Sequence, residues 1–218
     1  ILYDINETEF ISNGLCRLRD CISCVVTEER NSIYECDFEY PVGGANYDLI
    51  QLGRVVGVTH DDSGDIEPFD IVSYTRPIDG IVAFHCVHIS YRLSKYTAFG
   101  YQINSLADAF TMFRSAVPLM PFSFSTDKSS TGYLAAADGK PHTVRELMGA
   151  NTGAILDVYG GEYSFNNFNV YLYTARGQQR DFAIRYGVNM VDYNEEVDSS
   201  EAYSSCVPFW ASGDDIVI

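Results

Sequence analysis

Four groups of polar side chains have spacings that are typical of chemically active sites. They are His85-Cys86-Val87-His88, Cys21-x-x-Cys24, Asp61-Asp62-Ser63-Gly64-Asp65, and the alternating residues Glu35, Asp37 and Glu39. Paired histidines or thiols ligate metal ions, and paired thiols also exchange electrons. Clustered carboxylates at a turn bind calcium, and carboxylates on one strand face serve hydrolases as general acid and base.

The strand-like surroundings of the first two groups argue against metal binding. On a strand, positions 85 and 88 point to opposite faces, so the two histidines do not share an ion. A redox or zinc Cys-x-x-Cys motif needs a turn or a helix start, whereas residues 22–26 are β-like, and no second ligand pair follows at a suitable spacing. We therefore expect no metal site.

The remaining patterns also lack the partners that catalysis or ion binding needs. The Asp61–Asp65 segment departs from the EF-hand spacing, because no Gly follows Asp65 and no Glu closes the loop, so we expect a hairpin turn. His142 precedes a predicted helix, but none of the six cysteines has a nucleophile signature around it. The chain contains no H-E-x-x-H, G-x-S-x-G or phosphate-binding loop. We expect no cofactor and no enzymatic activity.

The acidic row belongs to a long predicted hairpin over residues 18–41, LRDCISCVVTEERNSIYECDFEYP. Strict alternation places Tyr34, Cys36, Phe38 and Tyr40 on one face of the second strand and the three acids on the other. The polar segment 29–32 is the predicted turn, with Asn31 suited to a left-handed conformation. Acidic alternate residues are also what a solvated strand face normally shows.

Composition excludes several classes of partner. The chain has 218 residues and a formal net charge of -16, so it repels phosphate backbones and anionic membrane surfaces. No apolar stretch approaches the roughly 20 residues that span a membrane. Most of the six cysteines occupy positions typical of core residues, so we expect reduced thiols.

The order of predicted elements indicates an α+β fold that is mainly antiparallel. Strands are expected at 21–28, 34–40, 52–59, 69–74 and 81–93, at a spacing typical of a small barrel or sandwich. Helices are expected at 105–117, at 143–149 with the capping box Thr143-Val144-Arg145-Glu146, and at 154–159. Further strands are expected at 162–165, 169–173, 182–186 and 207–210.

These elements predict two domains. Residues 1–94 form a β-barrel-like domain, which residues 205–218 are candidates to complete, and residues 95–204 form a smaller α+β domain.

Several segments, in order along the chain, resemble one family of phage proteins. They are the hairpin with its T-E-E-R-N turn and terminal Y-P, HISYRL at 88–93, PFSF at 121–124, VRELMG at 144–149, GAILDVYGGEYSF at 153–165, IRYGVNM at 184–190 and VPFW at 207–210. The chain resembles the N-terminal region of phage minor structural proteins, the tail-hub or prophage endopeptidase tail family. It departs from the family pattern at Val188, where relatives have a basic residue, and at Arg92, where they have an acid.

The resemblance implies a baseplate hub at the tip of a virion tail, assembled in the bacterial cytoplasm. It implies a homotrimeric ring that continues the tail tube, contacts the distal tail protein and the tape measure, and binds no specific nucleic acid. Glu35, Asp37 and Glu39 are then candidates for an acidic channel wall past which DNA slides.

The resemblance covers nearly the whole chain, so we expect an N-terminal fragment of a longer protein whose hydrolase, if any, lies further C-terminal. Two alternatives stay open: a carbohydrate- or receptor-binding module of the tail, in which Tyr side chains or Trp210 line a groove, and the non-catalytic part of a tail-associated endopeptidase.

Overall fold

The computed structural model describes residues 1–59, 64–75, 79–99, 102–129, 131–135, 140–149, 152–177, 183–190, 192, 210–212 and 215–217. Residues Ile1–Gly177 form one compact unit and residues Gln178–Ile218 a second. The predicted division into 1–94 and 95–204 stays a prediction.

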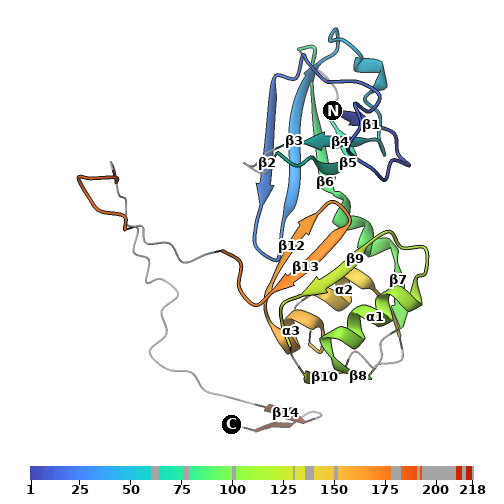
Figure 1. Ribbon diagram of the computed structural model, residues 1–218, viewed down its shortest axis with the longest axis vertical. Helices are drawn as coiled ribbons and strands as arrows, with labels where there is room; N and C mark the ends of the chain where they lie inside the picture. Colours follow the sequence, from blue (N-terminus) through green and yellow to red (C-terminus); the bar gives the residue numbers. More distant parts are fainter. Residues whose placement is uncertain are drawn as a thin grey trace. The chain divides into compact units, whose positions relative to one another are not determined.

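The N-terminal part of the first unit is a six-stranded antiparallel sheet (Figure 1). Its strands are β1 Leu2–Tyr3, β2 Ser23–Glu28, β3 Tyr34–Pro41, β4 Val55–Val58, β5 Glu67–Tyr74 and β6 Ile81–His88. A short 3-10 helix, η1 Tyr47–Leu49, follows β3, and a longer one, η2 Ile89–Lys95, follows β6. The spatial order is β1-β4-β5-β6-β3-β2, which leaves β1 and β2 as the two edges.

The hairpin prediction is confirmed. Strand β2 pairs antiparallel with β3, and Asn31 in the turn has a φ of 60°. Along β3 the apolar residues are buried, whereas the acids are exposed or half-buried. The buried side packs into a core that includes Phe38, Phe69 and Phe84.

The second part of the first unit combines small sheets with three helices. Its elements are β7 Thr97–Phe99, β8 Gln102–Ser105, α1 Leu106–Ala116, β9 Ser123–Thr126, β10 Thr131–Ala135, β11 Pro141–Thr143, α2 Val144–Met148, α3 Ile155–Tyr159, β12 Glu162–Asn166 and β13 Asn169–Tyr173. Strands β12 and β13 form a hairpin to which β9 adds in parallel, while β10 pairs with β8 and β11 with β7. All three helices contribute to one core with this three-stranded sheet.

The predicted helix starts are confirmed at the level of single hydrogen bonds. The Ser105 side chain accepts from the Asp108 N–H at the start of α1. Thr143 and Glu146 form the reciprocal capping box of α2. Gly161, which follows α3, has a φ of 110°, and a Cβ there would lie 2.6 Å from the Tyr173 carbonyl oxygen, so this close approach requires glycine.

Two predicted strands are corrected. The run predicted over 81–93 is a strand only to His88, and Ile89–Lys95 is the 3-10 helix η2, in which Ile89, Ser90 and Leu93 are buried. Within the predicted strand 182–186, the described residues form only an isolated bridge between Tyr186 and Met190. In the second unit, β14 Trp210–Ser212 pairs with β15 Asp215–Val217, and residues 207–209 of the predicted last strand lie outside the described residues.

The α+β, mainly antiparallel fold class is confirmed. None of the described helices is long and apolar enough to cross a membrane.

Candidate functional site

The predicted acidic row lies on the outward face of β3, between β2 and β6. In register, Glu35, Asp37 and Glu39 are opposite Val87, His85 and Ala83 of β6. The Asp37 side chain is 65% exposed and the Glu35 side chain 28% exposed. The sequence therefore placed all three acids on the correct face of the correct strand.

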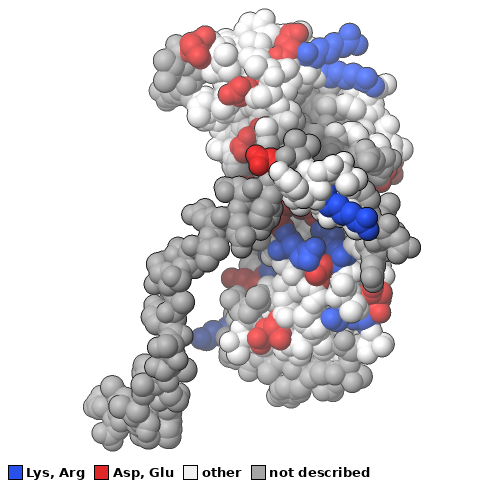
Figure 2. Space-filling view, turned by 90° about the vertical axis from the view of Figure 1, so that its left-hand side faces the viewer, with Lys and Arg blue, Asp and Glu red and all other residues white. Residues whose placement is uncertain are grey.

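Each acid of the row has a hydrogen-bond partner that fixes its side chain. The Tyr91 hydroxyl donates to Glu35 over 3.2 Å, and Ser23 donates to Glu39 over 3.0 Å. His85 Nδ1 lies 2.8 Å from Asp37 Oδ1 and its Nε2 lies 4.0 Å from Glu35 Oε2. The row is thus an ordered, solvent-facing set of carboxylates; its position in a channel stays a prediction. Acidic side chains are also dispersed over the face drawn in Figure 2 rather than gathered in one block.

Beside the row, one further carboxylate is neutralised. Arg92 in η2 binds Asp70 of β5 through two hydrogen bonds of 2.8 and 2.5 Å. Fork-like pairing of this kind is among the stronger polar contacts in proteins. It ties the segment after β6 back to the sheet.

His85 and His88 do face opposite sides of the sheet, as their spacing predicts. His88 is fully buried: its Nδ1 accepts from the Ser90 N–H, so Nε2 carries the proton and donates to Glu67 over 3.1 Å. Burial lowers the pKa of His88 below its ordinary value, against the opposing effect of Glu67. A His–Glu pair resembles a catalytic dyad, but a ring with no exposed surface cannot reach a substrate.

Glu67 also anchors the second part of the unit. Its Oε2 accepts from the Asn167 N–H over 2.9 Å, at the tight turn between β12 and β13. The pair therefore works as a buried polar joint between two segments that are 100 residues apart. Sequence reasoning missed this joint, since nothing local marks Glu67 as buried.

The tip of the β2–β3 hairpin is clamped to the start of β12. The Asn31 side chain donates to the Gly161 carbonyl over 2.9 Å and accepts from the Tyr163 N–H over 2.8 Å. Ion pairs flank this contact, Arg30 with Glu162 at 2.8 Å and Arg176 with Glu28 at 2.6 Å. The Asn31 side-chain amide thus forms two hydrogen bonds with the backbone at the start of β12, as a neighbouring strand would.

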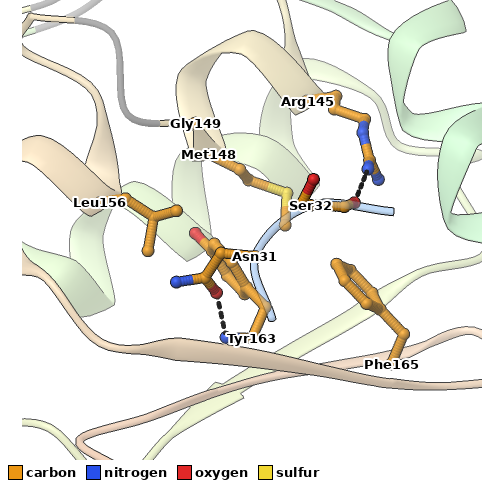
Figure 3. A pocket seen from close by; sticks show the side chains of 8 residues that line it. All are labelled: Asn31, Ser32, Arg145, Met148, Gly149, Leu156, Tyr163 and Phe165. Carbon is orange, nitrogen blue, oxygen red and sulfur yellow. Dashed lines mark hydrogen bonds between the residues drawn. The ribbon is translucent and has the colours of Figure 1, made fainter. Parts of the chain in front are cut away.

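A small pocket lies beside the clamp (Figure 3). The described residues that line it are Asn31, Ser32, Arg145, Met148, Gly149, Leu156, Tyr163 and Phe165. These residues include no thiol, carboxylate or imidazole. The lining therefore offers hydroxyl, amide and guanidinium groups for binding, while its hydroxyls have no imidazole or carboxylate in the lining to activate them.

Besides Asn31 and Ser32, the pocket has two polar side chains, Arg145 and Tyr163. The Arg145 guanidinium carbon lies 4.2 Å from the centroid of the Tyr91 ring, a cation–π contact, and its hydrogen bonds to Ser90 Oγ and the Ser32 carbonyl are both long, at 3.5 Å. The buried Tyr163 hydroxyl has no hydrogen-bond partner among the described residues, and burial raises its pKa.

No group of three or more His, Cys, Asp or Glu side chains within the described residues is arranged to hold a metal ion. Of the hairpin turn predicted at Asp61–Asp65, residues 61–63 lie outside the described residues. Cys21 and Cys24 do not act as a pair: the Cys21 thiol donates to the Ser23 carbonyl, while Cys24 contacts Cys36 at 3.6 Å. The register of the β2–β3 hairpin would have predicted the contact between Cys24 and Cys36.

Comparisons with known proteins bear on the fold. No protein-family model and no curated protein sequence matches the chain. The structure is similar to the crystal structure of prophage tail protein gp18 from Listeria monocytogenes EGD-e, with a TM-score of 0.55 and 13% sequence identity. The match covers 87% of this chain and 55% of that one, so the chain spans little more than half the length of its structural neighbour. The chain therefore shares the fold of a phage tail protein.

Proposed function

We propose that the chain is a structural component of a phage or prophage tail, and that it contributes to the hub ring at the distal end of the tail tube. The similarity to prophage tail protein gp18 over 87% of the chain carries the proposal. The order of the hub-like sequence segments supports the finer assignment to a homotrimeric hub that contacts the distal tail protein and the tape measure.

The acidic row gives this proposal a testable surface. A channel that conducts DNA benefits from a wall that repels phosphates, since a basic wall would bind the duplex. Glu35, Asp37 and Glu39 form an outward row whose side chains are already held by their own partners. In the proposed ring, this row faces the channel.

The first experiment is light scattering of the chain across a concentration series, together with electron microscopy of tails from the phage that encodes it. A trimer in solution and a three-fold ring containing this chain at the tail tip are the expected results. A chain located in side fibres, or a monomer that binds glycans on an array, would instead support a receptor-binding module.

A second experiment tests the channel wall with Asp37→Lys, which reverses the charge at the most exposed position of the row. The matched control is Asp48→Lys, which makes the same charge change at an exposed site away from the row. We expect virions with Asp37→Lys to release DNA more slowly in vitro, most strongly at low salt, and the control to release it normally. Equal behaviour of the two variants would place the row outside the channel.

A further inference from the structure

Three thiols lie near the free edge of the six-stranded sheet. Cys36 of β3 is directly opposite Cys86 of β6, and both are fully buried. Cys24 of β2 is opposite Phe38, one step diagonally from Cys36, and is exposed because β2 is an edge strand. The sulfur atoms of Cys24 and Cys36 are 3.6 Å apart.

We propose that Cys24 and Cys36 form a reversible thiol–disulfide site, with Cys24 as the attacking thiol and Cys36 as the resolving thiol. Their sulfur atoms are in contact at 3.6 Å, so a disulfide bond of about 2.05 Å forms when the two atoms approach each other further. The co-reactant is a low-molecular-weight disulfide such as oxidised glutathione. This proposal is independent of the tail function.

The exchange has two balanced steps. The Cys24 thiolate attacks one sulfur of the small disulfide, and the S–S bond of the small disulfide breaks. One half of the small disulfide remains bound to Cys24 as a mixed disulfide, and the other half leaves as a thiolate that takes up a proton. Cys36 then loses its proton and attacks the Cys24 sulfur, releasing the second small thiol. Two protein thiols are oxidised to one disulfide, and the small disulfide is reduced to two thiols that carry the two protons.

The surroundings of the thiols select Cys24 as the one that reacts first. With Cys36 as donor, the hydrogen bond between them lowers the pKa of Cys24 to about 7, against the opposing effect of burial. The same hydrogen bond, together with burial, raises the pKa of Cys36, and burial raises the pKa of Cys21 and of Cys86, so these three thiols hold less thiolate than Cys24 at neutral pH. Cys24 therefore combines exposure, thiolate character and a neighbouring thiol.

A disulfide here would act on the sheet edge. Strand β2 is held to the sheet on one side only, by β3. The new bond would add a covalent link to that pairing and close a short loop, since the two residues are 12 positions apart. It would fasten the edge strand without changing the register.

The test is peptide mapping by mass spectrometry after the chain has equilibrated with glutathione buffers of increasing oxidised fraction. We expect one linked pair of peptides, containing Cys24 and Cys36, to form and to disappear again on reduction. In Cys36→Ser, Cys24 should instead accumulate as the mixed disulfide with glutathione. Cys21→Ser is the matched control and should still form the Cys24–Cys36 link.

Two results would overturn the proposal. One is a disulfide between Cys24 and a cysteine other than Cys36. The other is a wild-type chain in which the mixed disulfide of Cys24 with glutathione accumulates as much as it does in Cys36→Ser. A second measurement does not depend on the fold of a variant: in the wild-type chain, alkylation of Cys24 should follow an inflection near pH 7. An alkylation rate that rises only above about pH 8, as for an ordinary thiol, would contradict the assigned role of Cys36.

Discussion

Replacing Asn31 with glycine tests the clamp between the hairpin tip and β12. The substitution removes both side-chain hydrogen bonds, to the Gly161 carbonyl and from the Tyr163 N–H, while glycine tolerates the φ of 60° at this position. A hydrogen bond of this kind contributes about 0.5–1.5 kcal/mol, so the pair contributes about 1–3 kcal/mol.

Asn46→Gly is the matched control. Asn46 has a φ of 63°, nearly the same backbone conformation, but its side chain makes no capping hydrogen bond. The backbone effects of glycine, in the folded and unfolded chain, are therefore common to both variants. The difference between the two variants isolates the hydrogen bonds of Asn31, with an expected value of about 2 kcal/mol.

The assay is urea unfolding followed by far-UV circular dichroism at 25 °C, with a thermal melt as a second readout. For a unit of this size, about 2 kcal/mol corresponds to a melting temperature lower by roughly 4–8 °C. Asn31→Asp, which keeps the acceptor for Tyr163 and loses the donor to Gly161, should fall between wild type and Asn31→Gly. A difference below about 0.5 kcal/mol between Asn31→Gly and Asn46→Gly would refute the clamp.

Two buried groups give further predictions. The folded-state pKa of His88 lies below its unfolded value near 6.5, so the unfolded chain binds the proton more tightly and stability is lost as pH falls through and below about 6.5. Urea unfolding at pH 7.5 and 5.5 should show a pH-dependent loss that is smaller in His88→Gln, and equal losses would contradict the assignment. Tyr163→Phe removes a buried hydroxyl without a partner among the described residues, so unfolding free energy should stay level or rise by about 1 kcal/mol. Tyr3→Phe, which removes a hydroxyl bonded to the Ser12 carbonyl at 2.9 Å, should instead lower it by about 1 kcal/mol, and a destabilised Tyr163→Phe would indicate a bound partner for that hydroxyl.

Local patterns predicted the elements best. Alternation along 34–40 fixed the faces of β3, and the cap residues Ser105 and Thr143 marked the true starts of two helices. Each of these signals depends only on residues that are a few positions apart in the sequence. The 3-10 helix η2 was missed because Ile89 and Tyr91 continue the strand-like run of β6. The His88 side chain, which caps the Ser90 N–H, and the burial of Ile89 and Leu93 accompany the helix instead.

The candidate site was predicted in part. The acidic row was found because its face follows from strand periodicity alone. The buried Glu67 joint and the Asn31 clamp depend on which segments meet in space, and their partners are 100 or more residues away. Predicting the contact between Cys24 and Cys36 requires the register of the hairpin, which follows from the turn at 29–32. The Cys-x-x-Cys spacing instead suggested a pair of Cys21 with Cys24.

The Asn31 clamp also orders events during synthesis of the chain. Asn31 and its partner Tyr163 are 132 positions apart, so the hairpin tip leaves the ribosome long before the strand that receives it. Throughout that interval the turn amide is satisfied by water alone, and the sheet can close without the second part. Closure of a contact this distant carries a loop-entropy cost, and docking of β12 on the hairpin tip can begin only once residue 163 has been made. A chain built this way can complete its N-terminal sheet before its junction forms.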